Sequence, residues 1–122
     1  MPAPEIPPHL QLPVTTTFTI EGCRIAQYRG LARGITVRAP TIPQGIVGGL
    51  ENIFGGRIDA YTEMCEQARQ QAFDLMLRHA WELGANAVVG VRYDASEVVS
   101  KGSATEVLCY GTAVVIEPVA PG

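Results

Sequence analysis

Three cysteines and two histidines are the residues of this chain best suited to bind a metal ion or to attack a substrate. The cysteines stand at positions 23, 65 and 109, and no two of them form a CxxC pair. Structural zinc sites usually draw their ligands from such closely spaced pairs. We therefore expect reduced thiols buried as small apolar side chains, with a metal site as the alternative. That alternative would use Cys23, Cys65, Cys109 and His79, with subunits around a symmetry axis each contributing a ligand.

Nucleophilic catalysis by cysteine would need a histidine held beside the thiol to take its proton. His79 falls in the last turns of a predicted helix, where a packed or capping histidine is favourable. His9 lies in a proline-rich segment and is expected to be exposed. The glycine-rich segment from Gly45 lacks the Gly-Lys-Ser/Thr ending of a phosphate-binding loop. The sequence therefore predicts no enzyme and no cofactor, and an enzyme with an intersubunit pocket at Tyr61 and Trp81 ranks last.

The composition is that of a small chain with few charges. Its 122 residues suit one domain, and its formal net charge is −3. Lysine and arginine form no cluster of the kind that binds nucleic acid. Hydrophobic residues make up 47% and charged residues only 17%, so we expect part of the surface to be buried in an assembly. An uncharged run at residues 39–50 is too short to span a bilayer, and no signal peptide is expected, which predicts a cytoplasmic location without membrane contact.

The first half of the chain divides into a proline-rich arm and a strand-rich region. Five prolines in residues 1–13 favour a disordered arm over one laid on a neighbour. Residues 14–20 are rich in β-branched side chains and predict a first strand. Residues 23–38 predict a second strand, bulged near residues 30–34, that forms a hairpin with the first. Residues 44–54 predict a short helix. The domain is expected to cover residues 14–118, followed by a short tail at 119–122.

A long helix is predicted from residue 58 or 59 to residue 83, with Gly84 as the residue that ends it. One apolar stripe along it should lie on the sheet. Because a single sheet can cover only one stripe, a second apolar group is expected to need another subunit. The stripe for the sheet comprises Tyr61, Met64, Cys65, Ala68, Ala72, Leu75, Met76, His79 and Leu83, and the second group comprises Phe73, Leu77, Ala80 and Trp81.

Two further strands are predicted at residues 86–94 and 105–116. The last strand is apolar on both faces, and the helix can cover only one of them. The order β-β-(short helix)-α-β-β predicts a two-layer α+β domain, with one long helix on a mostly antiparallel sheet. The face of the last strand that should contact a second subunit carries Leu108, Tyr110, Val114 and Ile116.

Three segments resemble the YbjQ-like family, which is described as putative heavy-metal-binding. These are residues 45–61, residues 83–94 with the sequence LGANAVVGVRYD, and residues 110–114, within a similarity that covers roughly residues 17–117. The resemblance implies a dodecin-like subunit that forms a ring of five, with two rings stacked as a decamer, and it implies no established catalytic activity. We therefore expect a homo-oligomeric, ring-forming scaffold or binding protein whose ligand the sequence does not name. The alternative is a heavy-metal-binding or metal-stress protein that uses cysteine thiols.

Overall fold

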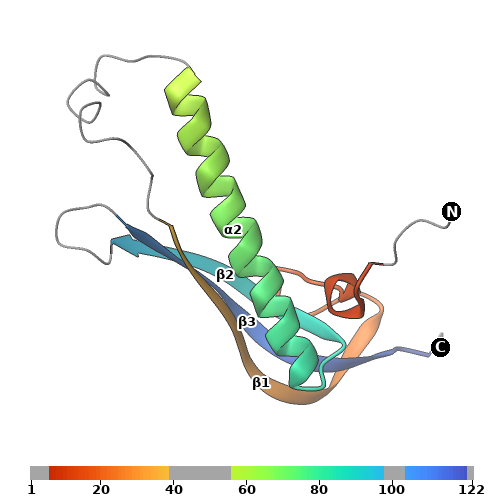
Figure 1. Ribbon diagram of the computed structural model, residues 1–122. Helices are drawn as coiled ribbons and strands as arrows, with labels where there is room; N and C mark the ends of the chain where they lie inside the picture. The colour runs from red at the N-terminus through yellow and green to blue at the C-terminus, as the bar shows by residue number, and fades with distance from the viewer. Residues whose placement is uncertain (1–5, 39–55, 98–103, 121–122) are drawn as a thin grey trace, which may run out of the picture.

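In the computed structural model, one long helix lies across a three-stranded sheet (Figure 1). The structure describes residues 6–38, 56–97 and 104–120, and the side chains of residues 56–61 are outside this description. The elements are the 3-10 helix η1 (Pro8–Gln11), β1 (Cys23–Arg38), α2 (Gly56–Glu82), β2 (Ala87–Glu97) and β3 (Thr105–Pro118). The α+β class is confirmed. The predicted short helix at residues 44–54 lies outside the described residues.

The sheet has the order β1-β3-β2, and both pairs of neighbouring strands are antiparallel. In the middle of the sheet, Gly34 of β1 pairs with Cys109 of β3, which pairs in turn with Tyr93 of β2. The irregularity predicted near residues 30–34 lies earlier in β1: the register shifts between Ile25 and Gln27 and between Tyr28 and Gly30, and it is regular from Gly30 to Gly34. Gly30 has a φ of 114°, which only glycine adopts easily. A single bent strand therefore runs the whole length of residues 23–38.

Small residues allow the helix to lie close to the sheet. A Cβ atom added at Gly34 would stand 2.1 Å from the carbonyl oxygen of Ala72 and 2.5 Å from the amide nitrogen of Met76. Beside this point, the hydroxyl of Thr36 donates a 2.8 Å hydrogen bond to Oε1 of Gln71. The core between helix and sheet includes the fully buried Met76. Glycine at position 34 is therefore what lets α2 pack backbone to backbone against β1.

Side chains fix the end of the helix and the start of the next strand. Gly84 has a φ of 85°, as predicted for the residue that ends α2, and Nε of Arg29 donates a 2.7 Å hydrogen bond to the carbonyl of Leu83. Two residues later, Asn86 contacts the backbone of Ile116 twice. Its Nδ2 donates to the carbonyl at 3.0 Å, and its Oδ1 accepts from the amide at 2.7 Å. The turn from helix to β2 is thereby attached to β3.

The prediction of a first strand at residues 14–20 was wrong. This segment makes an isolated parallel bridge, from Val14 to Val88, and then continues along the edge of β2 in bends. Threonine hydroxyls compete with a strand ladder by bonding nearby backbone groups. Here Oγ1 of Thr15 accepts from the amide of Thr17 at 3.1 Å, and Oγ1 of Thr17 donates to the carbonyl of Thr19 at 2.6 Å. The segment therefore does not form a hairpin with β1.

The part of the proline-rich arm that the structure describes lies on the chain's own helix, beside α2 (Figure 1). Leu12 and Val14 pack against the cluster that contains Leu77 and Ala80, both of which are buried. The expectation that this second apolar group needs another subunit is therefore corrected for Leu77 and Ala80. Their cover comes from the segment that precedes the sheet. Phe73 is half-buried in the same cluster.

The far face of β3 is likewise covered in part by its own chain. Val114 is fully buried with Ala87 and Val89, and Ile20 and Ile25 pack against this group. Val114 is thus corrected from an interface residue to a core residue, because residues 20–25 close over that end of the sheet. Ile116 is half-buried in the same place. Among the described residues, no helix has the length and hydropathy needed to cross a membrane.

Candidate functional site

The middle of the sheet is uncovered on the face opposite the helix. Along β1, positions 32, 34 and 36 point toward α2 and are buried, whereas Leu31, Ile35 and Val37 are 57%, 47% and 55% exposed. On β3, Leu108 and Tyr110 are half-buried and stand opposite Ile35 and Arg33. We call Leu31, Ile35, Val37, Leu108 and Tyr110 the outer sheet face. A groove of about 360 Å³ lies on this face, and its lining residues are Leu31, Arg33, Ile35, Asp94, Leu108 and Tyr110.

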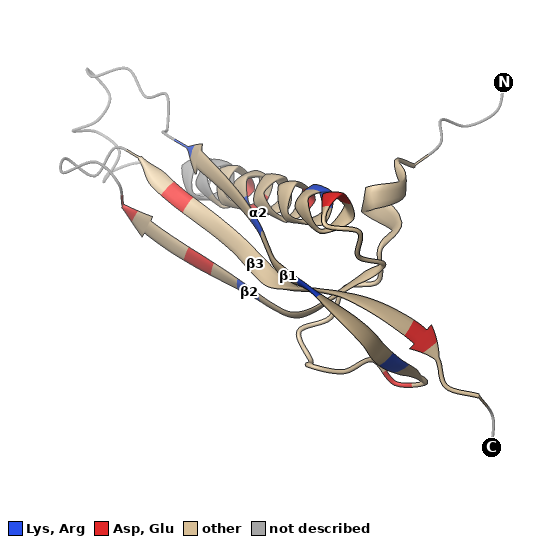
Figure 2. Cartoon of the chain, turned by 90° about the horizontal axis from the view of Figure 1, so that it is seen from below, with Lys and Arg blue, Asp and Glu red and all other residues tan. Residues whose placement is uncertain are grey.

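The groove has an apolar floor and one charge at each edge. Arg33 stands on β1 and Asp94 on β2, with β3 between them. Within the described residues, neither side chain belongs to an ion pair. β3, the strand between them, carries no charged residue between Glu106 and Glu117 (Figure 2). A partner that docks here would therefore meet apolar side chains in the centre and opposite charges at the two rims.

The exposed strand residues of this face were not among the predicted interface residues. Leu31, Ile35 and Val37 recur at even spacing, and this period could have identified them as one face of a strand. Of the predicted residues, Leu108 and Tyr110 do line the groove. Trp81 is 49% exposed on α2 and does not belong to the outer sheet face.

Cys109 lies in the core between helix and sheet. Its Sγ stands 3.7 Å from Sδ of Met76, and Tyr93 is its neighbour across the sheet on β2. Burial raises the pKa of the Cys109 thiol to about 11. Burial, and then the neighbouring Cys109, raise the pKa of Tyr93 to about 12. Because the thiolate is the nucleophile and the metal-binding form, a protonated Cys109 is an inert core residue at neutral pH.

The other predicted metal ligands lie on separate parts of the fold. Cys65 is exposed on α2, and Cys23 is half-buried at the start of β1. His79 is half-buried on α2, where its Nδ1 accepts a 3.0 Å hydrogen bond from the backbone amide of Arg33. In the part of the chain that the structure describes, His, Cys, Asp and Glu form no group of three or more able to hold a metal ion. The residues described within one subunit therefore do not fit a metal centre.

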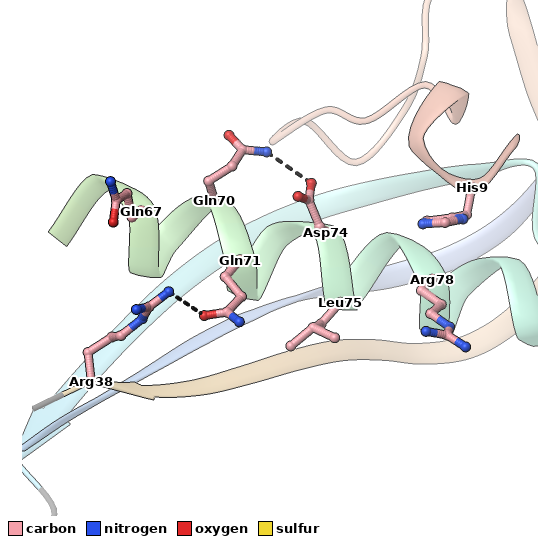
Figure 3. Close-up of a pocket in the computed structure, with 8 residues that line it drawn as sticks. All are labelled: His9, Arg38, Gln67, Gln70, Gln71, Asp74, Leu75 and Arg78. Atoms are coloured by element: carbon pink, nitrogen blue, oxygen red, sulfur yellow. Dashed lines mark hydrogen bonds between the residues drawn. The ribbon is translucent and has the colours of Figure 1, made fainter. Parts of the chain in front are cut away.

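A second groove, of about 460 Å³, runs along the solvent side of α2 (Figure 3). Four of its polar side chains bind one another. Gln70 donates to Asp74 at 2.9 Å, and Arg38 donates to Gln71 at 2.9 Å. Such pairing is typical of a solvated helix face. The lining residues are His9, Arg38, Gln67, Gln70, Gln71, Asp74, Leu75 and Arg78.

Comparison with known proteins gives consistent matches along nearly the whole described chain. A family model with the description "Putative heavy-metal-binding" matches residues 12–117. A UPF0145 protein of Legionella pneumophila is 56% identical over 103 residues, which cover 84% of this chain and 96% of the relative. A UPF0145 protein of Chromobacterium violaceum is 50% identical over 107 residues, covering 88% and 90% of the two chains.

A solved structure gives independent support for the fold. It is the crystal structure of a protein of unknown function from Pediococcus pentosaceus that belongs to the DUF74 family. The two folds superimpose with a TM-score of 0.59, over 87% of this chain and 98% of the other, at 17% sequence identity. At this identity the likeness supports the arrangement of helix and sheet and nothing about a ligand.

Proposed function

Because the chain belongs to the YbjQ-like family, and its relatives above are named without any reaction, we propose that it is a non-enzymatic, self-assembling protein of the cytoplasm. Its function is that of a homo-oligomeric scaffold or binding protein. The single observation that carries this proposal is the outer sheet face, where Leu31, Ile35 and Val37 are each about half exposed or more. All three cysteines are free, which suits a reducing compartment.

The proposed partner of the outer sheet face is another copy of the same chain. Contiguous exposed apolar patches on small proteins mark interaction sites. A closed ring needs two different patches that fit each other, because its contacts run head to tail. The described chain offers two such surfaces, since Trp81 is 49% exposed on the helix and the groove lies across the sheet. We propose that Trp81 of one subunit fills the groove of the next.

The chemistry of the two surfaces supports this pairing. A large aromatic side chain that enters an apolar pocket is the usual anchor of a protein interface. The helix surface around Trp81 carries the ion pair between Arg78 and Glu82, and the groove carries Arg33 on its β1 rim and Asp94 on its β2 rim. Opposite charges at the rim set the orientation of docking more than its strength. The number of subunits that the family resemblance implies is five, in one ring or in two stacked rings.

Light scattering behind a sizing column, at micromolar concentration, tests the proposal. A ring of five has about five times the 13.1 kDa mass of the chain, and a stacked pair of rings has twice that mass. Replacement of Ile35 by Asp introduces a charge into the centre of the groove, and Trp81→Ala removes the anchor. Both variants are expected to elute as smaller species with unchanged far-ultraviolet circular dichroism.

The matched control is Val119→Asp, which changes an equally exposed apolar residue, 56% accessible, outside both surfaces. This variant should keep the mass of the parent protein. A parent protein that is monomeric at micromolar concentration would refute self-assembly itself. A parent-sized oligomer of Ile35→Asp would show that the outer sheet face is not the interface.

Metal analysis separates this proposal from the alternative suggested by the family description. The protein is purified without a histidine tag, alongside a variant with alanine at positions 23, 65 and 109. The proposal expects no stoichiometric metal in either sample. A bound metal that disappears with the three thiols would instead establish the cysteine-based function.

A further inference from the structure

One hydrogen bond joins the last turns of α2 to the edge of the sheet. The backbone amide of Arg33 on β1 donates to Nδ1 of His79 at 3.0 Å, across 46 positions of the chain. In an antiparallel ladder, every second residue points its amide away from the neighbouring strand. Arg33 is such a residue, and among the described strands β1 pairs with β3 alone. The imidazole of His79 therefore closes one amide on the open edge of β1.

The chemistry of histidine makes this hydrogen bond depend on pH. Nδ1 accepts a hydrogen bond only while it carries no proton, so His79 is neutral here and holds its proton on Nε2. A second proton would turn Nδ1 into a donor that faces the amide donor of Arg33, and the hydrogen bond would break. Histidine side chains change their charge between about pH 5 and 8, which places this event in a physiological range.

The groups around His79 are mostly cationic or uncharged. The charged and titratable side chains on the elements that pack here are Arg29 and Arg33 on β1, Arg78 and Glu82 on α2, His9 on η1 and Cys109 on β3. Glu82 is the carboxylate of this set, and it already pairs with Arg78 at 3.4 Å. Nε of Arg29 is bound to the carbonyl of Leu83, one turn beyond His79. A second proton on His79 would therefore add positive charge to surroundings that are already basic.

The hydrogen bond lies between the two surfaces of the proposed subunit contact. Arg33 stands on the rim of the groove, and Trp81 follows His79 by two residues on α2. Subunits of a ring meet head to tail, so the angle between the two surfaces of one subunit decides whether the ring closes. Loss of the bond detaches the end of α2 from β1 at this point. The anchor and the groove of one subunit are then held less firmly at the angle that the ring needs.

From this geometry we propose that protonation of His79 regulates self-assembly, a role that rests on the proposed function above. The neutral imidazole holds α2 and β1 together, and the subunits associate. The imidazolium releases the amide of Arg33, and the association weakens. The assembly is therefore expected to be complete at about pH 8 and to dissociate as the pH falls to about 6.

A dilution series of the full chain, followed by light scattering at about pH 8 and about pH 6, tests this proposal. Both values lie above the isoelectric point of about 5.3, where loss of net charge would promote precipitation. The dissociation constant of the parent is expected to rise by about tenfold at the lower pH, the equivalent of one lost hydrogen bond. His79→Gln supplies an amide oxygen that can accept from Arg33 at either pH, so its dissociation constant should stay nearly constant. The control His9→Gln removes the other histidine of the chain and should respond like the parent.

The regulation and the proposed function fail in different ways. A parent protein that is monomeric at both pH values would overturn the proposed function together with its regulation. A parent that assembles equally well at both pH values, or a His79→Gln protein that dissociates at the lower pH as the parent does, would overturn the role of His79 alone. If His79→Gln does not assemble at the higher pH, hydrogen exchange of the Arg33 amide in the parent decides the question. Relative to the other amides of β1, it should lose protection at the lower pH, and unchanged protection would overturn the proposal.

Discussion

Addition of one methyl group at Gly34 is expected to push the helix off the sheet. The Cβ of Gly34→Ala would stand 2.1 Å from the carbonyl oxygen of Ala72, 2.5 Å from the amide nitrogen of Met76 and 2.8 Å from Cβ of Leu75. Ordinary contacts of a Cβ begin at 3.4 Å, and real ones are essentially never under 3.0 Å. Backbone atoms cannot rotate away as a side chain can. The helix must therefore retreat from β1 by about 1 Å.

The size of the effect follows from what the retreat separates. A gap of 0.5–1 Å removes about a quarter to a half of the dispersion energy of the atoms involved. Met76 and Ala72 are fully buried at this contact, so the core opens where it is tightest. Overpacked cores lose about 1–3 kcal/mol, and a backbone clash belongs at or above the top of that range. We expect about 3 kcal/mol, which corresponds to a melting temperature lower by about 10 °C or more.

Urea unfolding, followed by circular dichroism and tryptophan fluorescence at one fixed protein concentration, measures this loss. The matched comparison is Gly111→Ala, where the nearest atoms are methyl carbons of Val88 and Val91 at 2.8 and 3.0 Å. Those side chains can shift, so a smaller loss is expected. Glycine-to-alanine changes at tolerant positions stabilise proteins by about 0.4–1 kcal/mol. A Gly34→Ala protein as stable as the parent, or less affected than Gly111→Ala, would refute the close packing of α2 on β1.

Three further expectations concern single side chains. Asn86→Asp keeps the acceptor for the amide of Ile116 but loses the donor to its carbonyl. We expect urea unfolding to show about 1–2 kcal/mol of destabilisation, and a smaller loss for a substitution at the exposed Glu97. Iodoacetamide at pH 8 should modify Cys65 first and leave Cys109 protected in the folded protein, and rapid labelling of Cys109 would contradict its burial. The pKa of Cys109 rises from 9.0 to about 11 on folding, so the folded state keeps the thiol proton to a higher pH than the unfolded state does. The contribution of the protonated thiol to stability is therefore complete below pH 9 and is lost as the pH rises to 11. Thermal melts across pH 8–11 should show this decline for the parent and a flatter profile for Cys109→Ala.

The elements that depend on local sequence could be predicted from it. The long helix and its end at Gly84 follow from a stripe of period 3.6 and from a glycine that adopts a positive φ. The strands β2 and β3 follow from alternation and β-branched residues. The same rule misled at residues 14–20, where four threonines favour the prediction of a strand. Their hydroxyls bond the nearby backbone instead, and the segment lies along the edge of β2.

Which apolar side chains are buried was decided by the tertiary structure. Apolar periodicity predicted a second apolar group on the helix and a second apolar face on the last strand, but it could not say which residues cover them. Leu77 and Ala80 share the core with Leu12, and Val114 is enclosed near Ile20, because segments distant in sequence fold back over them. The apolar surface that stays exposed lies on the outer sheet face, at Leu31, Ile35 and Val37.

The candidate sites show the same division. The sequence determined that no cysteine or histidine pair has metal-ligand spacing, and it supplied the family resemblance that the comparisons confirm. Only the tertiary structure brought Leu31 and Ile35 of β1 together with Leu108 and Tyr110 of β3 around one groove. Only burial raised the pKa of the Cys109 thiol to about 11. A residue type and its local period are encoded in sequence, whereas proximity and desolvation arise when distant segments meet.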